Sequence, residues 1–207
     1  MNLRGLYAIT PDHPARVRPV AELVEAALAG GAVLIQYRDK SKDARRRERE
    51  ARAVLRLCQD FGVPLLINDD LALARRISAQ GVHLGQGDVD PREARRQLGS
   101  ETIVGFSCYN QFQRAQQAKA WGLDYLAFGR FFPSRTKPQA AQADPALLVR
   151  AKRELGLPLV AIGGLTPENS PPLIAAGADL LAVVDGVFAA PDVQAAAQAF
   201  TDLFQEH

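Results

Sequence analysis

Short apolar runs alternate with segments of helical spacing along the whole chain. The runs lack the period-two pattern of half-buried strands and are apolar on both faces. This is typical of parallel strands that are covered on both sides. We therefore predict eight strands, at Leu6–Ile9, Ala32–Gln36, Leu65–Ile67, Val82–Leu84, Ile103–Phe106, Tyr125–Phe128, Leu159–Ile162 and Leu180–Val184.

The segments between these runs have the spacing of amphipathic helices. Glycines such as Gly62, Gly81 and Gly122 stand between a helical segment and the next strand, where a left-handed helix cap is expected. After the second run, apolar residues recur every three or four positions, which predicts a helix with one buried stripe. That stripe consists of Ala51, Val54, Leu55, Cys58 and Phe61.

Eight strand–helix units close most economically into a barrel. We therefore predict an α/β protein, a compact single-domain (β/α)8 TIM barrel over residues 1–207. An open doubly wound sheet is the alternative. No Gly-x-Gly-x-x-Gly motif follows the first predicted strand, so the dinucleotide-binding version of that sheet has no support.

Composition and charge narrow the choice of partners. The chain of 207 residues is 47% hydrophobic and 23% charged, and its net charge of +2 gives no reason to expect nucleic acid or a membrane surface as a partner. No apolar run approaches the roughly 20 residues of a membrane span. The two cysteines form no disulfide or metal pattern and fit a reducing cytoplasm. The oligomeric state stays open.

Gln36, Arg38 and Lys40 follow the second predicted strand and are spaced by two. An extended backbone turns all three side chains the same way, toward the mouth of a barrel. One amide and two cations that converge there predict a site for an anion or a polarised ring. The alternative is a solvated strand end with surface ion pairs.

Asp69 and Asp88 follow the third and fourth predicted strands, which are neighbours in a barrel. Two carboxylates on adjacent strand ends can hold one Mg²⁺, with substrate phosphates in its remaining positions. The same pair could instead be a general acid and base, or helix N-caps. Asp70 and Asp90 fit the role of caps better, because each stands directly before a helical segment.

Hydroxyl and ammonium groups follow the fifth and sixth predicted strands. Ser107 ends the fifth, and the loop 130–143 after the sixth carries Ser134, Thr136 and Lys137. These groups are natural donors to phosphate oxygens. The loop is long and contains prolines, which makes it a candidate lid.

Gly163-Gly164 and Gly186 follow the seventh and eighth predicted strands. Many barrels bind phosphate at this place with backbone N–H groups. Two other polar residues fit a structural role better. We predict that His83 is a hydrogen-bonded interior group and that Cys108 is an inert buried thiol.

In these same places the chain resembles the thiamine-phosphate synthases, and the resemblance spans nearly the whole chain. It implies a TIM-barrel transferase of thiamine biosynthesis. That enzyme joins 4-amino-2-methyl-5-(diphosphooxymethyl)pyrimidine to 4-methyl-5-(2-phosphooxyethyl)thiazole and releases diphosphate. The matching segments are Gln36-Tyr37-Arg38-Asp39-Lys40, Ile67-Asn68-Asp69, Gly81-Val82-His83-Leu84-Gly85-Gln86, Phe132-Pro133-Ser134-Arg135-Thr136-Lys137 and Ala161-Ile162-Gly163-Gly164.

The resemblance also implies a role for each matching residue. Arg38, Lys40 and Lys137 would act on the leaving diphosphate, and Asp69 and Asp88 would hold Mg²⁺. The mechanism would be dissociative, so that diphosphate leaves before the thiazole nitrogen adds to a pyrimidine-methyl cation. Contacts to the pyrimidine diphosphate would come from Gln36, Arg38, Lys40, Asn68, Ser107 and Lys137. Contacts to the thiazole phosphate would come from Ser134, Thr136, Gly164, Val184 and Asp185.

One position departs from that family. Many members carry a small hydroxyl residue near the thiazole phosphate, where this chain has Asp185. A carboxylate repels a phosphate. Either Asp185 points away and the backbone N–H groups of Gly186 and Val187 bind the phosphate, or the affinity for the thiazole phosphate is weakened.

Three other functions are compatible with a barrel of this kind. A thiazole tautomerase resembles the synthase in its fold and its Ala-Ile-Gly-Gly segment, but it would not need Arg38, Asp69 and Asp88. A phosphosugar isomerase would need an acid–base pair on its strand ends and no diphosphate-binding loop. A non-catalytic binding protein for thiamine precursors is distinguished from an enzyme only by a measurement of turnover.

Overall fold

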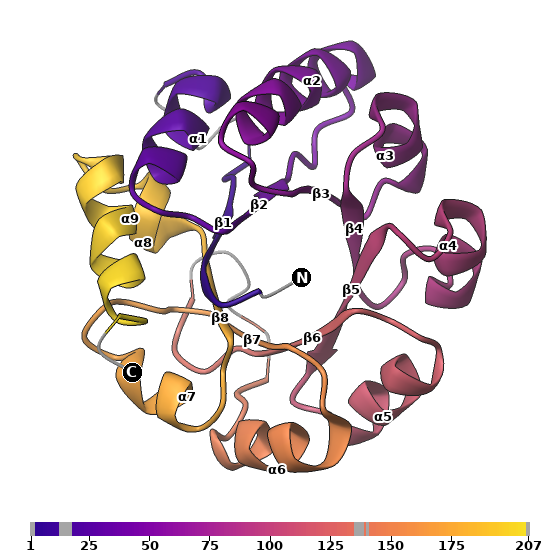
Figure 1. Ribbon diagram of the computed structural model, residues 1–207, viewed down its shortest axis with the longest axis vertical. Helices are drawn as coiled ribbons and strands as arrows, with labels where there is room; N and C mark the ends of the chain where they lie inside the picture. The colour runs from indigo at the N-terminus through magenta and orange to yellow at the C-terminus, as the bar shows by residue number, and fades with distance from the viewer. Residues whose placement is uncertain (1–2, 13–17, 135–138, 140, 206–207) are drawn as a thin grey trace.

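The computed structural model describes residues 3–12, 18–134, 139 and 141–205. Its centre is a closed barrel of eight parallel strands, paired in chain order, in which β8 returns to pair with β1 (Figure 1). The predicted TIM barrel is confirmed, and the open sheet is excluded. The strands are β1 (Gly5–Ile9), β2 (Leu34–Tyr37), β3 (Leu65–Asn68), β4 (Gly81–Leu84), β5 (Ile103–Tyr109), β6 (Tyr125–Gly129), β7 (Leu159–Ile162) and β8 (Leu180–Val183).

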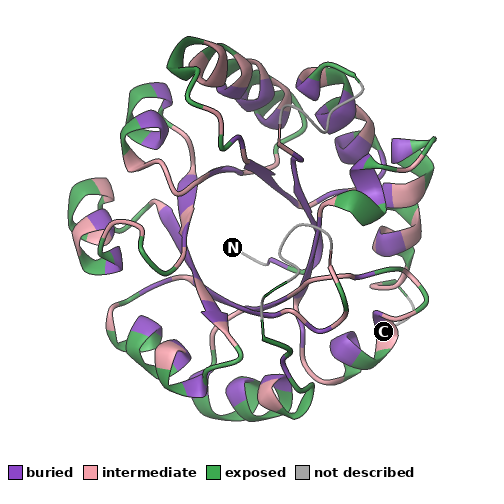
Figure 2. Ribbon diagram, turned by 180° about the vertical axis from the view of Figure 1, so that it is seen from behind, coloured by how far each residue is buried: buried purple, intermediate pink, exposed green. Residues whose placement is uncertain are grey.

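Helices form a ring outside the barrel, with their buried residues turned toward the strands and their exposed residues turned outward (Figure 2). In the described part of the chain, none of them has the length and apolar character needed to cross a membrane. The helices are α1 (Val20–Ala29), α2 (Ala44–Asp60), α3 (Leu71–Ile77), α4 (Pro91–Leu98), α5 (Phe112–Ala120), α6 (Ala146–Leu155), α7 (Pro171–Ala175), α8 (Asp185–Phe188) and α9 (Val193–Asp202).

Two helices begin at the predicted aspartate caps. The Asp70 carboxylate accepts a hydrogen bond from the backbone N–H of Leu73 at 2.8 Å, and the Asp90 carboxylate accepts one from Arg92 at 2.9 Å. Each cap satisfies a backbone donor that the first turn of a helix leaves without an intrahelical partner. The caps fix the points at which the chain leaves the mouth of the barrel and enters α3 and α4.

Several strands begin or end one to three residues from their predicted bounds, and the roles predicted for Phe61 and Gly81 are wrong. Phe61 does not belong to the buried stripe of α2, because it follows the last helical residue and is 46% exposed. Gly81 is not a helix cap but the first residue of β4, where a Cβ would lie 2.2 Å from the backbone oxygen of Ile103. Ser78, with φ 56°, provides the left-handed cap of α3 instead.

The barrel interior opposite the mouth is apolar. Leu34, Leu66, Ile103, Val160 and Leu180 come from the first or second positions of their strands and are all buried. Such a layer of branched side chains is the expected filling of a TIM barrel. This apolar layer fills the N-terminal end of the barrel. Polar side chains further along the same strands therefore open only toward the C-terminal mouth.

Candidate active site

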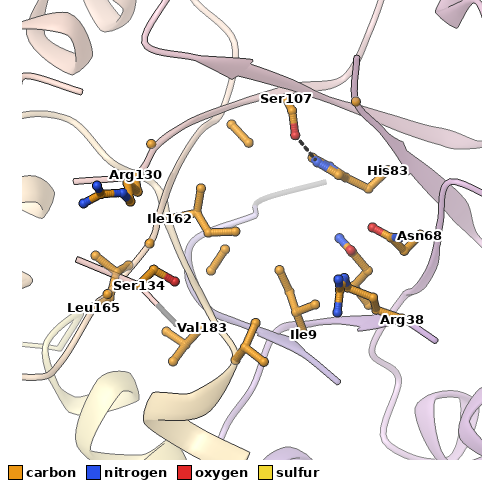
Figure 3. A pocket seen from close by; sticks show the side chains of 18 of the residues that line it. Ile9, Arg38, Asn68, His83, Ser107, Arg130, Ser134, Ile162, Leu165 and Val183 are labelled. Carbon is orange, nitrogen blue, oxygen red and sulfur yellow. Dashed lines mark hydrogen bonds between the residues drawn. The ribbon is translucent and has the colours of Figure 1, made fainter. Parts of the chain in front are cut away.

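A cavity of about 550 Å³ lies at the C-terminal ends of the strands. Figure 3 shows side chains from several strands turned into it. Such a volume lies within the usual range for small-molecule sites. Thr136 and Lys137 lie outside the described residues. The other predicted site residues all line this cavity: Gln36, Arg38, Lys40, Asn68, Asp69, Asp88, Ser107, Ser134, Gly164, Val184 and Asp185.

Asp69 and Asp88 form a carboxyl pair, each within hydrogen-bonding reach of the other. Burial and the Asp69 carboxyl raise the pKa of Asp88. Burial acts in the same direction on Asp69, but hydrogen bonds from Lys40 and Asp88 outweigh it and hold the pKa of Asp69 below its usual range. Two carboxyls this close cannot both ionise at low cost unless a cation joins them.

The surroundings of this pair exclude the reading of Asp69 and Asp88 as helix caps. The Asn68 side-chain amide donates to Asp69 Oδ2 at 2.8 Å, and the Gly85 backbone N–H donates to Asp88 Oδ2 at 2.7 Å. Asp69 itself has φ 62°, a left-handed conformation that costs a non-glycine residue energy. These contacts aim the two carboxylates at each other across the ends of β3 and β4.

The donor set fits a magnesium ion. Mg²⁺ binds oxygen ligands, and proteins commonly supply only one or two carboxylates and leave the other positions to water and substrate phosphates. Within the described residues, no group of three or more His, Cys, Asp or Glu side chains could enclose a metal. A two-carboxylate site open to a cavity matches a metal that is shared with a phosphorylated substrate.

Arg38 and Lys40 bring two positive charges to the same side of the cavity. Arg38 Nη1 pairs with Asp12 Oδ2 at 2.7 Å, and Lys40 Nζ pairs with the Asp69 carboxylate. The Arg38 side chain is 14% exposed and that of Lys40 is 54% exposed. Neighbouring carboxylates therefore hold two cations in place that would otherwise repel each other.

The sequence analysis missed Asp12. Its carboxylate holds Arg38 and also accepts a hydrogen bond from the backbone N–H of Lys40 at 3.0 Å. Asp12 stands three residues after the end of β1, so the rule that selected the other strand-end residues applies to it as well. Its pairing with Arg38 could not be predicted, because the contact joins residues 26 positions apart.

His83 is part of the site as well as of the interior. The predicted hydrogen bonds are present, with Nδ1 at 2.6 Å from the Tyr125 hydroxyl and Nε2 at 2.9 Å from Ser107 Oγ. The ring is only partly buried and lines the cavity (Figure 3). Cys108, by contrast, is fully buried beside Ser107, and burial raises the pKa of its thiol to about 12.

The opposite side of the cavity is made mainly of backbone and aliphatic groups. Gly163 and Gly164 have positive φ values of 103° and 65°. A Cβ at Gly163 would lie 2.3 Å from Arg130 Cβ, and a Cβ at Gly164 would lie 2.2 Å from the backbone oxygen of Pro133. These glycines therefore allow the loop after β6, which includes Ser134, to lie directly against the loop after β7.

Asp185 lines the cavity as the first residue of the short helix α8 and is exposed. Val184, which precedes it, is half-buried. The rim near β8 thus carries an exposed carboxyl group.

Comparisons with known proteins agree with this geometry. A family model described as thiamine monophosphate synthase matches residues 6–187. The thiamine-phosphate synthase of Thiobacillus denitrificans is 54% identical over 200 residues, which cover 97% of this chain and 94% of the relative. The corresponding protein of Marinobacter nauticus is 53% identical over 205 residues, covering 98% and 92%. The solved thiamine phosphate pyrophosphorylase of Pyrococcus furiosus has a TM-score of 0.90 and 30% identity, covering 99% of this chain and 97% of that one.

Proposed function

The chain belongs to the thiamine monophosphate synthase family, and we propose how the cavity at its barrel mouth makes thiamine phosphate. One side of the cavity binds the pyrimidine-methyl diphosphate and draws off diphosphate. The other side presents the thiazole phosphate to the carbon that is left. The observation that carries this assignment is the convergence of Arg38, Lys40, Asp69 and Asp88 in one cavity.

The polar side of the cavity binds the pyrimidine diphosphate. Arg38 and Lys40 neutralise the diphosphate as its bond to carbon breaks, and Lys137, outside the described residues, joins them from the loop after β6. Gln36, Asn68 and Ser107 contact the pyrimidine end of the substrate. When diphosphate binds, Arg38 and Lys40 exchange carboxylate partners for phosphate oxygens, which are equally good acceptors.

Asp69 and Asp88 would hold Mg²⁺. When bound, the metal would supply positive charge to the diphosphate oxygens and so make diphosphate a better leaving group. Asn68 and the Gly85 N–H, which already bond to the two carboxylates, keep these oriented toward the cavity. Lys40 pairs with Asp69, and it would exchange this carboxylate for a phosphate oxygen of the bound substrate.

The reaction needs no nucleophile from the protein. The carbon–oxygen bond of the pyrimidine-methyl diphosphate breaks, and its electron pair leaves on diphosphate. The lone pair of the thiazole nitrogen then forms the new carbon–nitrogen bond to the pyrimidine-methyl cation. Catalysis therefore comes from placing the two substrates in line and from stabilising the leaving group. The hydrogen-bond donors and charges around the cavity support a mechanism in which the protein orients the substrates and stabilises the leaving group, while the substrates supply both reacting atoms.

The backbone side of the cavity binds the thiazole phosphate. Ser134, Gly164 and Val184 form this part of the wall together with Asp185, and Thr136 belongs to the same loop as Ser134. Backbone N–H groups and hydroxyls bind a phosphate without adding charge, which suits an anion that must stay bound while another leaves.

The enzyme works on small molecules in a reducing compartment such as the cytoplasm. Its two cysteines, Cys58 and Cys108, are both free thiols, which is their usual state in a reducing compartment.

A turnover assay tests the proposal. The purified protein receives the pyrimidine diphosphate, the thiazole phosphate and Mg²⁺, and thiamine phosphate is followed with and without chelator. We expect product that disappears with chelator and returns with added Mg²⁺. Product that persists in chelator would remove the metal from the proposal. A folded protein that makes no product from verified substrates would favour the tautomerase or the binding protein.

A further inference from the structure

Five side chains form a hydrogen-bonded chain across the barrel interior, which we call the relay. Gln36 Nε2 donates to the Tyr7 hydroxyl, which lies 2.9 Å from the Tyr125 hydroxyl. Tyr125 bonds in turn to His83 Nδ1 at 2.6 Å, and His83 Nε2 bonds to Ser107 Oγ at 2.9 Å. Both ends of the relay line the cavity, whereas the two tyrosines are buried beneath it.

The barrel is shaped to hold this relay. The Tyr125 ring occupies the space that a side chain on β5 would take, since a Cβ at Gly105 would lie 1.9 Å from Tyr125 Cζ. The His83 and Tyr125 rings stack with centroids 5.6 Å apart, and the Tyr7 and Tyr125 rings meet edge to face at 5.9 Å. These contacts fix both tyrosine rings, so their hydroxyls have few alternative partners.

One order of donors leaves every buried hydroxyl hydrogen of the relay with an acceptor. Gln36 Nε2 donates to the Tyr7 oxygen, so Tyr7 donates to Tyr125 and Tyr125 donates to His83 Nδ1. The His83 ring then carries its proton on Nε2 and donates it to Ser107. Burial raises the pKa of both tyrosines, so each keeps the hydrogen that this order requires.

This direction decides what the two ends of the relay offer to a ligand. The side-chain amide of Gln36 donates an N–H to Tyr7, so its carbonyl oxygen is the group available to accept a hydrogen bond from a ligand in the cavity. Ser107 accepts from His83 and presents its hydroxyl hydrogen, which is a donor. An aminopyrimidine matches this pair, because its exocyclic amine donates and its ring nitrogens accept. The oxo analogue presents a carbonyl oxygen where the amine would be.

We infer that the relay makes the site specific for an aminopyrimidine over an oxopyrimidine, with Tyr7, Tyr125 and His83 as positioning residues that fix the polarity of Gln36 and Ser107. This inference rests on the proposed function, in which Gln36 and Ser107 contact the pyrimidine. It assigns a task to two tyrosines that touch neither substrate.

Competition between substrates tests the inference. The ratio of kcat/KM for the amino-pyrimidine diphosphate to that for its 4-oxo analogue is measured in the wild type, Tyr7→Phe and Tyr125→Phe. We expect a wild-type ratio on the order of 10³ or more, because a site with buried polar groups rejects a mismatched ligand strongly. Each variant lets the polarity of the relay reverse and lowers the ratio on the order of 10- to 100-fold.

Tyr37→Phe is the matched control. Tyr37 is also buried and donates to Glu50 at 2.9 Å, but it does not belong to the relay. Removing its hydroxyl costs a hydrogen bond of the same kind and leaves the ratio unchanged. Loss of discrimination in Tyr37→Phe as well, or an unchanged ratio in both relay variants, would overturn the inference.

A spectroscopic measurement keeps the inference testable if the variants fold poorly or the wild type makes no product. The ¹⁵N chemical shifts of the imidazole rings report which nitrogen carries the proton, and the chain has only three histidines. His83→Gln identifies the signals of His83. We expect the neutral Nε2–H form at pH 8, whereas a proton on Nδ1 or on both nitrogens would overturn the inference. An inactive wild type with the expected shifts would refute the proposed function and leave the relay intact.

Discussion

The two halves of the cavity rim are built in opposite ways. The polar half, at the ends of β2 to β5, consists of Gln36, Arg38, Lys40, Asn68, Asp69, His83, Asp88 and Ser107. The backbone half, at the ends of β7 and β8, consists of Ile162, Gly163, Gly164, Leu165, Val183 and Val184. Figure 3 shows Asn68, His83 and Ser107 on one side, with Ile162 and Leu165 on the other.

The difference shows how one small cavity can hold two anions, the diphosphate that leaves and the thiazole phosphate that stays bound. The polar half concentrates charge, which must be held in place by partners such as Asp12 until the substrate arrives. The backbone half carries Arg130 and Asp185 at its edge but is made mainly of backbone and aliphatic groups, and it depends on how closely its loops approach, which Gly163 and Gly164 permit. Charge suits the anion that leaves, and fixed backbone suits the one that stays. The two halves should therefore fail in different ways when they are mutated.

The largest effect is expected from the carboxyl pair of the polar half. Asp69→Asn or Asp88→Asn removes the charge that would hold Mg²⁺, and kcat/KM should fall on the order of 10³-fold. The measurement is a Mg²⁺ titration of turnover in each variant. A normal rate with an unchanged Mg²⁺ requirement in both variants would show that the metal binds elsewhere.

Asp179→Asn is the matched control at the other end of the barrel. Asp179 pairs with Lys152 at 2.6 Å and accepts the backbone N–H of Leu159 at 2.9 Å, so it fastens helix α6 to the start of β7. This variant should lose about 1–2 kcal/mol of unfolding free energy while kcat/KM stays within a factor of about two. The same chemical change then separates a stabilising carboxylate from a functional one.

The next effect is expected on the backbone half. Gly164→Ala places a Cβ against the Pro133 backbone oxygen in a left-handed conformation, which forces the two loops apart. The KM for the thiazole phosphate should rise about 10- to 100-fold, whereas the KM for the pyrimidine diphosphate stays nearly constant. Initial rates with each substrate varied in turn measure this split, and an equal rise in both KM values would contradict the division into halves.

Gly156→Ala controls for the backbone conformation alone. Gly156 ends helix α6 with φ 69°, and a Cβ there would meet no atom within 4 Å. The substitution should cost about 1 kcal/mol of stability and change neither KM. A change in the KM for the thiazole phosphate here would mean that stability, and not loop contact, governs the backbone half.

A smaller effect is expected from Asp12. Asp12→Asn removes the charge that holds Arg38 but keeps a side chain of the same shape, so the KM for the pyrimidine diphosphate should rise about 3- to 10-fold. Arg38→Lys keeps the charge and loses the planar fork, which should raise the same KM by a similar factor. If Asp12→Asn instead lowered this KM, the Asp12 carboxylate would compete with diphosphate for Arg38 and would not orient Arg38 for binding.

Much of the fold could be predicted because parallel strands are buried on both faces. Such strands produce continuous apolar runs, and β7 matches its predicted bounds, Leu159–Ile162. Errors lie at strand ends, where packing and not composition decides. Gly81 belongs to β4 because only a residue without a side chain fits against Ile103, and a run of apolar letters does not reveal that neighbour.

The site could be predicted in part for a similar reason. The strands of a barrel end at one face, so residues that follow them meet whatever their distance in sequence. The relay that joins Gln36 to Ser107 could not be predicted from strand-end positions. Its two tyrosines, Tyr7 and Tyr125, look like ordinary core residues within apolar runs. They are 118 positions apart, and they meet only because the barrel closes and Gly105 leaves room for one ring.

The smallest effect is expected at Asp185, an exposed carboxyl group on the rim near the backbone half. Asp185→Ser removes a carboxylate that repels the thiazole phosphate and should lower its KM about two- to fourfold, because an exposed charge acts weakly through solvent. The measurement compares this KM in the variant and the wild type at low and high ionic strength. Salt screens an exposed charge, so the advantage of the variant should shrink as salt is added. If the KM rose in Asp185→Ser, the carboxylate would support the loop, and the backbone half would depend on a charged side chain after all.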